Sequence, residues 1–200
     1  MGPTARTVAA NLRRLREARG MSLRALSTEV GATGHTLSAD AINKIENGRQ
    51  EGARQVRRAD TDDLIALALA LNVSPLALLL PPVADDEPVE LTAAVTVTSR
   101  AAWSWAEGRA AVGAPEAADA VTRHERQEAY EALTLPPERR RLESLPAVRS
   151  ARRLYETLAE LISISPTPGQ SAAAHGKAAR RRHQQLGHEI EELVEQMPDA

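Results

Sequence analysis

Residues 42–49, INKIENGR, decide the fold that this 200-residue sequence predicts. Ile42 and Ile45 have the spacing of the inward face of a helix, and Ser38 is a favourable residue to cap its N-terminus. The dipeptide Asn47-Gly48 is a turn signal that ends the helix. The pattern therefore predicts a short helix near residues 38–46 with a polar outward face.

Two amphipathic helices are predicted upstream of this segment. The first runs from about Ala9 to Arg19 and is stopped by Gly20, which favours the left-handed conformation found after helix ends. The second runs from Leu23 to Val30 and can be capped by Ser22. Helical spacing gives the two helices these inward residues: Val8, Leu12, Leu15, Leu23, Leu26 and Val30.

Two more helices are predicted downstream of it. Acidic residues at 60, 62 and 63 favour a helix start, because carboxylates are stabilised at the positive end of the helix dipole. The stretch Leu64–Leu71 is apolar nearly all round, which predicts that it is buried on every side. Ser74-Pro75 can open a short helix over Leu76–Leu80. Residues 1–82 thus read as an all-α domain of five short helices.

The rest of the chain gives weaker signals. Residues 84–90 are acidic and predict a linker, and Leu91–Thr98 is the one convincing strand, followed by Trp103 and Trp105 in alternation. Helices are predicted over Ala147–Ile162 and Lys177–Gln196, with apolar stripes at Leu154–Ile162 and Leu186–Val194. These stripes are either candidate dimer interfaces or faces that pack on each other within one chain. We therefore expect three parts: a domain at 1–82, an acidic extension at 83–136, and a mostly helical region at 137–200.

Composition narrows the class of protein. The chain has no Cys, which excludes disulfides and thiolate metal sites, and Phe is absent. Residues 1–10 lack the apolar stretch of a signal peptide, and no apolar run is long enough to cross a bilayer, so we expect a soluble, cytoplasmic protein. Residues 1–58 hold eleven Lys/Arg against five Asp/Glu, whereas residues 59–135 hold four against thirteen. This asymmetry predicts an anionic partner for the N-terminal end.

With Leu26, Ile42 and Ile45 in this order, the run Ile45-Glu46-Asn47-Gly48-Arg49 resembles the signature of the Cro/repressor helix-turn-helix family. The resemblance covers about residues 8–81. It implies a lambda-repressor-like five-helix fold whose third helix enters the major groove of double-stranded DNA. It also implies a homodimer, because one small domain contacts few base pairs.

The outward residues of the third helix suit base recognition. Asn can pair with adenine, Lys with guanine and Asp with the cytosine amino group, and Ala can meet a thymine methyl. The expected base contacts are Ala39, Asp40, Asn43 and Lys44. The expected phosphate contacts are Arg14, Asn47, Arg49, Arg54, Arg57 and Arg58. In this family an Arg at the position of Arg16 commonly pairs with the Glu of the motif, and we therefore expect an Arg16–Glu46 ion pair.

The turn before the third helix departs from the family. Residues 31–37 make it several residues longer than the usual turn of about four residues. Either the second and third helices cross as in the family, with the excess looped out over His35, or their angle changes.

Other functions have little support in the sequence. His183 and His188 are five residues apart, which does not align two metal ligands on one helical face, and we expect no metal or cofactor site. The sequence has no glycine-rich phosphate loop and no nucleophile motif, so we expect no enzyme. Two alternatives stay open: a protein-interaction adaptor of antitoxin-like or anti-sigma-like type, and a regulator that senses a small-molecule effector through Trp103 and Trp105.

Overall fold

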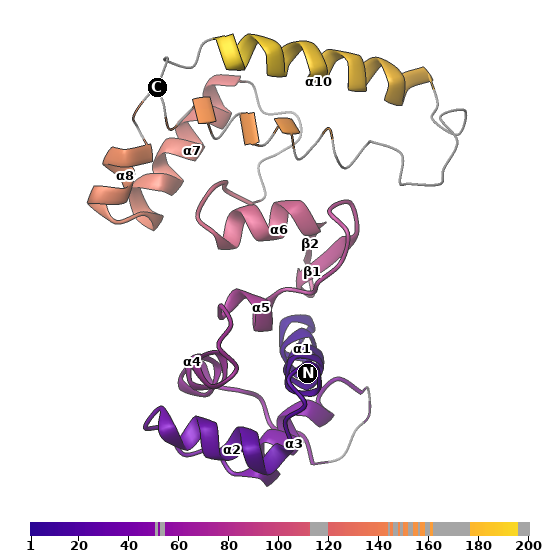
Figure 1. Cartoon of the computed structure of the whole chain (residues 1–200), viewed down its shortest axis with the longest axis vertical. Coiled ribbons are helices and arrows are strands. Elements are labelled where there is room, and N and C mark those ends of the chain that lie inside the picture. Colours follow the sequence, from indigo (N-terminus) through magenta and orange to yellow (C-terminus); the bar gives the residue numbers. More distant parts are fainter. Residues whose placement is uncertain are drawn as a thin grey trace. The chain divides into compact units, whose positions relative to one another are not determined.

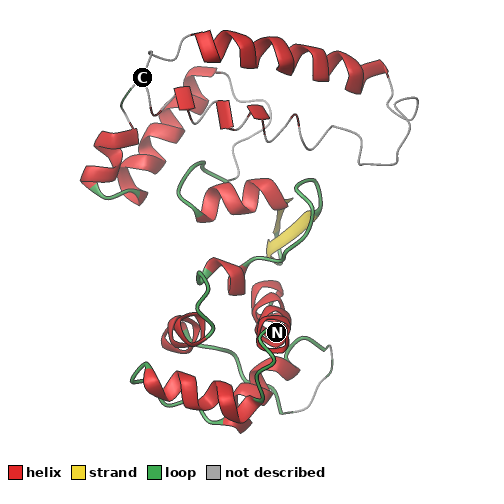
Figure 2. Cartoon of the chain, viewed as in Figure 1, coloured by secondary structure: helices red, strands yellow, loops and turns green. Residues whose placement is uncertain are grey.

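The computed structural model describes residues 1–50, 52, 55–112, 120–143 and 177–195, together with isolated positions between 145 and 161. These residues are mostly helical, with one two-stranded sheet (Figure 2). They belong to two compact units, residues 1–127 and residues 128–200. The predicted class, all-α with at most a short β segment, is confirmed.

Five helices open the first unit (Figure 1). They are α1 (Pro3–Ala18), α2 (Leu23–Ala32), α3 (Ala39–Asn47), α4 (Thr61–Ala70) and α5 (Leu76–Leu79). The predicted caps form: Ser22 Oγ accepts from Ala25 N, and Ser38 Oγ accepts from Ala41 N, both at 3.1 Å. Helix α1 begins six residues earlier than predicted, because Pro3 suits the first position of a helix, where no amide hydrogen is needed.

One hydrophobic core joins these helices. The predicted inward residues Leu12, Leu26, Val30, Ile42 and Ile45 are all buried in it. It is completed by Leu37, Ala66, Leu67, Ala68, Leu71 and Leu78. The buried Asn11 side chain donates to the carbonyl oxygens of Leu78 and Leu80, at 3.1 and 2.8 Å, and so fixes the end of α5 to α1.

The apolar composition of α4 predicted that it is buried on every side, and this prediction is wrong. Leu67 is fully buried, but Ile65 is 46% exposed and Leu69 is 63% exposed. Helices α2 and α5 pack against α4, and the side chains of Ile65 and Leu69 are left in contact with solvent.

Residues 88–98 form a hairpin in place of the single predicted strand. Strands β1 (Pro88–Thr92) and β2 (Val95–Thr98) pair antiparallel, with Val89 opposite Val97. The chain reverses at 93–94, where Ala94 N donates to Thr92 Oγ1 at 3.2 Å. The prediction missed this reversal because Ala-Ala lacks the Gly, Asn or Pro typical of a hairpin turn.

Both tryptophans lie on a helix, which overturns their predicted alternation along an extended segment. Thr98 caps α6 (Ser99–Ala106) by accepting from Ala101 N at 3.3 Å. Trp103 packs against a second cluster of Leu80, Val89 and Ala102, whereas Trp105 is exposed. The hairpin is joined to α1, because Thr4 Oγ1 donates to Leu91 O at 2.6 Å. The sequence-based boundary after residue 82 stays a prediction.

The described residues of the second unit are mostly helical. It contains the C-terminal part of α7 (Ala120–Thr134), from residue 128 on, together with α8 (Pro137–Glu143) and α10 (Lys177–Glu195). Helix α10 matches the predicted helix to within one residue and buries Leu186, while Val194 is exposed. The described positions of the predicted helix at 147–162 are helical, and Ile162 lies outside the described residues. No described helix is long and apolar enough to span a membrane.

Candidate functional site

The outward face of α3 carries the residues expected to contact bases. Asp40 and Asn43 are exposed, and Ala39 and Lys44 are partly exposed. Ile42 and Ile45 bury the opposite face in the core. The helix is therefore fixed from behind while its polar side stays open.

Two of these residues bind each other. Lys44 Nζ lies 2.7 Å from Asp40 Oδ2, an ion pair one helical turn apart on an exposed surface. Such a pair contributes about 0.3–0.5 kcal/mol, so a stronger partner can take Lys44 away from Asp40. Among the described residues, the Asn43 side chain has no hydrogen-bond partner.

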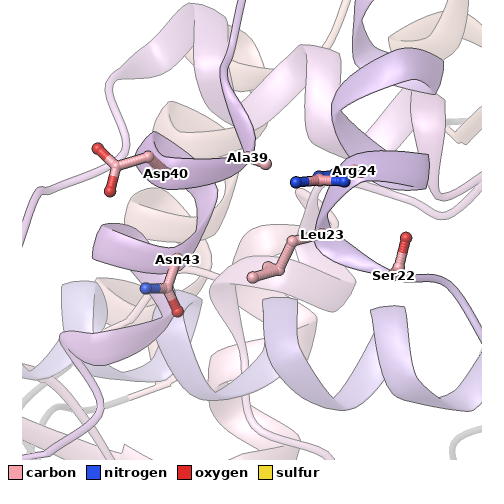
Figure 3. A pocket seen from close by; sticks show the side chains of 6 residues that line it. All are labelled: Ser22, Leu23, Arg24, Ala39, Asp40 and Asn43. Atoms are coloured by element: carbon pink, nitrogen blue, oxygen red, sulfur yellow. The ribbon is translucent and has the colours of Figure 1, made fainter.

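A groove lies where the N-terminal ends of α2 and α3 meet (Figure 3). Its volume is about 410 Å³, and it is lined by Ser22, Leu23, Arg24, Ala39, Asp40 and Asn43. Helix N-termini carry partial positive charge and attract anions. Arg24 adds a full positive charge to this groove, and sequence reasoning missed it because a lone exposed Arg gives no periodic signal.

A second groove collects three arginines. It has a volume of about 430 Å³ and is lined by Arg6, Thr7, Ala10, Asn11, Arg14, Arg49, Pro81 and Pro82. Arg49 Nη1 donates to Glu46 O at 2.8 Å, and Arg6 Nη1 donates to Met1 O at 2.8 Å. The structure thus brings together two predicted phosphate contacts, Arg14 and Arg49, with Arg6, which the sequence did not single out. We call this set the arginine groove.

The other predicted phosphate contacts lie in different surroundings. Arg58 is exposed and Asn47 is partly exposed, whereas Arg54 lies outside the described residues. Arg57 Nη2 is bound to Asp63 Oδ2 at 2.7 Å, and it also lies 3.5 Å from Asp60. This pairing does not favour a contact between Arg57 and a phosphate.

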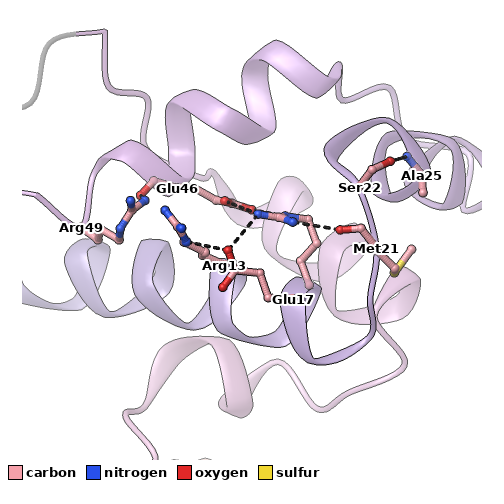
Figure 4. Close-up of polar contacts among 8 residues, drawn as sticks. Arg13, Glu17, Met21, Ser22, Ala25, Glu46 and Arg49 are labelled. Atoms are coloured by element: carbon pink, nitrogen blue, oxygen red, sulfur yellow. Dashed lines mark hydrogen bonds and ion pairs between the residues drawn. The ribbon is translucent and has the colours of Figure 1, made fainter.

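Arg16 and Glu46 join α1 to α3 through two charged hydrogen bonds (Figure 4). Nε donates to Oε1 at 2.6 Å and Nη2 donates to Oε2 at 2.8 Å. The side chains are 12% and 4% exposed. Nη1 of the same guanidinium donates to Met21 O at 2.9 Å. The hydrogen bonds that Arg16 donates to the Glu46 carboxylate raise the pKa of Arg16 above its ordinary value, although burial opposes the shift.

The long turn before α3 is fastened to the domain. Helix α2 continues to Ala32, so the turn comprises residues 33–38, which is still longer than the usual four or so. His35 is not looped out, since its Nε2 lies 2.9 Å from Asp63 Oδ1. Leu37 is buried in the core, and its carbonyl accepts from Ser27 Oγ at 2.7 Å.

Comparison with known proteins places this site in a familiar kind of domain. Residues 7–79 match a family described as a helix-turn-helix domain, which agrees with the Cro/repressor-type resemblance of the N-terminal part. No curated protein and no solved structure shows a significant match to the chain. Among the described residues, no group of three or more His, Cys, Asp or Glu side chains is placed to hold a metal ion.

Proposed function

We propose, from the helix-turn-helix domain at residues 7–79, that this chain is a sequence-specific transcriptional regulator that binds double-stranded DNA. The domain indicates DNA binding in general, and the outward face of α3 supports the finer statement. Asn43 and Lys44 stand there on a helix that Ile42 and Ile45 hold against the core. Amide and ammonium groups on a rigid helix are suited to read base edges in the major groove.

The two grooves support contacts to the DNA backbone at both ends of α3. Arg24 lies at the N-terminal end of α3, and Arg49 follows its C-terminal end. Nine residues at 1.5 Å each make α3 about 13 Å long, close to the roughly 12 Å width of the major groove. Cations at both ends of the helix can therefore contact phosphates on both sides of the groove, which would set affinity and salt dependence.

The proposed regulator is a cytoplasmic homodimer. It acts by binding DNA and not by catalysis. Two domains on half-sites one helical turn apart are the usual way for such small modules to gain specificity. The apolar stripe of α10 is a weaker dimer interface than the sequence suggested, because Leu186 is already buried within its own chain. Trp103 is packed in a hydrophobic cluster, which favours a structural role over effector binding.

A protein-interaction adaptor is the second candidate function. The observation that favours it is the exposed apolar face of α4 at Ile65 and Leu69, since such faces often bind protein partners. An adaptor would form a salt-independent complex with its protein partner and would have no DNA affinity.

Substitutions on α3 and beside it test the proposed function. Asn43→Ala and Lys44→Ala should each relax preference at one base position, by about 1–3 kcal/mol. Arg49→Ala should weaken binding to all sequences alike and reduce the slope of log K against log salt by about 1. Affinities for a selected site and its single-base variants, at two salt concentrations, separate these effects. If both classes of variant behave alike, α3 does not read bases.

The arginine groove has a matched control on its own helix. Arg14→Gln removes one charge inside the groove, and Arg19→Gln removes the same charge at the end of α1, where Arg19 donates to Asn72 O. A lost phosphate contact should reduce the salt slope by about 0.9 for Arg14→Gln, with little change for Arg19→Gln. Equal slopes for the two variants would show that the groove makes no phosphate contact.

A further inference from the structure

Asp63, at the start of α4, binds three groups from two segments of the chain: the turn before α3 and the loop between α3 and α4. Its Oδ1 lies 2.9 Å from Nε2 of His35, and its Oδ2 accepts from Arg57 Nη2 at 2.7 Å and from Asp60 N at 3.2 Å. An ionised carboxylate can only accept, so His35 donates through Nε2. The Asp63 side chain is 1% exposed, which is rare for an Asp unless it is fully paired.

The two side chains bound to Asp63 come from opposite flanks of α3. His35 belongs to the long turn that enters the helix, and Arg57 belongs to the loop that leaves it. The leaving loop is also tied to α3 by its backbone, since Arg57 N donates to Lys44 O at 3.1 Å. We propose that Asp63 is a positioning residue that holds α3 in place from both flanks. We further propose that this positioning sets the selectivity of α3 for DNA sequence, a second part that rests on the proposed function.

Helix capping alone does not account for this arrangement. In a capping box, the third helical residue needs one oxygen to accept from the N-cap amide, and Oδ2 of Asp63 meets that need at Asp60. The other oxygen, Oδ1, is directed at His35, 28 residues away in the sequence. The second oxygen and the Arg57 contact thus serve tertiary structure.

Helix α3 needs such a hold. Nine residues are too few for a helix to be stable by itself in water. The turn before it has six residues and includes Gly34, at a φ of +85°. A glycine restricts the backbone less than other residues do, so this residue does not itself fix the path of the turn. Leu37, next to Ser38, is anchored in the core. The contact of His35 with α4 is a second anchor in the same turn, and together the two limit the positions open to Ser38, where α3 begins.

Base contacts depend on the placement of α3 more than phosphate contacts do. Hydrogen bonds to base edges require the side chains within about 0.5 Å of their proper positions, whereas long arginines can follow a phosphate. A loosened α3 should therefore lose selectivity while it keeps most of its salt-dependent affinity for any DNA.

Asp63→Asn in the full chain tests this proposal, with Asp62→Asn as the matched control. Asn keeps the size of the side chain but offers a single acceptor oxygen, and Asp62 is the exposed neighbour on the same turn. Amide hydrogen exchange of residues 39–47 should become about tenfold faster relative to that of α1 in Asp63→Asn and stay unchanged in Asp62→Asn. Equal acceleration of both helices would overturn the proposal, because Asp63 would then only stabilise the domain.

A milder pair of variants serves if Asp63→Asn does not fold. His35→Ala removes the contact between the turn and Asp63, at a side chain that is partly exposed. Thr36→Ala, at the next and exposed residue, is its control. His35→Gln keeps a side-chain donor, so amide exchange in α3 should be slower in His35→Gln than in His35→Ala. Failure of His35→Ala to accelerate exchange in α3 would equally overturn the proposal.

The ratio of affinities for selected and random DNA measures the consequence for selectivity. It should fall about tenfold in Asp63→Asn, the effect of losing about one base contact, with the salt slope on random DNA unchanged. A change in exchange without a change in this ratio overturns the second part of the proposal. If the unaltered chain selects no DNA, the proposed function fails, and hydrogen exchange alone decides whether Asp63 holds α3.

Discussion

Replacing Glu46 with alanine is expected to lower the free energy of unfolding of the first unit by about 3–5 kcal/mol. In the unaltered chain the Arg16 side chain is 12% exposed, and the substitution removes the carboxylate that accepts two of its hydrogen bonds. Removing one partner of a buried ion pair is costly for this reason, even where the intact pair contributes little. Urea denaturation followed by circular dichroism measures the change.

Glu17→Ala is the control for this substitution. Glu17 lies on α1, binds Arg13 at 2.7 Å and lies 3.7 Å from Arg16 Nη2. Its side chain is 51% exposed, and such exposed pairs contribute at most about 1 kcal/mol. If Glu46→Ala and Glu17→Ala cost the same, the Arg16–Glu46 pair does not join α1 to α3 in solution.

Leu67→Ala is expected to cost about 2–5 kcal/mol of stability, while Leu69→Ala costs only a few tenths. The two leucines are two positions apart on α4, and the substitution is chemically the same. Leu67 is fully buried in the core, so its truncation leaves a cavity, whereas Leu69 is 63% exposed. Denaturation midpoints and slopes of the two variants provide the comparison.

A large cost for Leu69→Ala would contradict the one-sided burial of α4. The face of Ile65 and Leu69 would then be covered in solution. A dependence of that cost on protein concentration would point to a second copy of the chain as the cover.

The helices of the first unit could be predicted because their signals are local. Ser22 and Ser38 lie within three residues of the amides they cap, and Ile42 and Ile45 are spaced by the helical repeat. These features need no knowledge of the rest of the chain. The apolar spacing of α10 likewise predicted the helix, although within that stripe Leu186 is buried and Val194 is exposed.

Contacts between distant segments could not be predicted in this way. The His35–Asp63 contact spans 28 residues, and Arg6 reaches the arginine groove only through the packing of α1 beside Pro81 and Pro82. The prediction that α4 is buried on every side failed for a related reason, because an apolar sequence does not tell how many other helices pack against a helix. Arg16 and Glu46 could be paired in advance only through the family resemblance.

Selection of binding sites from random double-stranded DNA, at two salt concentrations, tests the central claim most directly. The proposed function predicts enrichment of a defined site, two-fold symmetric if the chain binds as a dimer, with affinity that falls steeply as salt rises. Absence of enrichment, together with absence of salt-dependent binding, would contradict it. The helix-turn-helix domain would then serve protein–protein interaction.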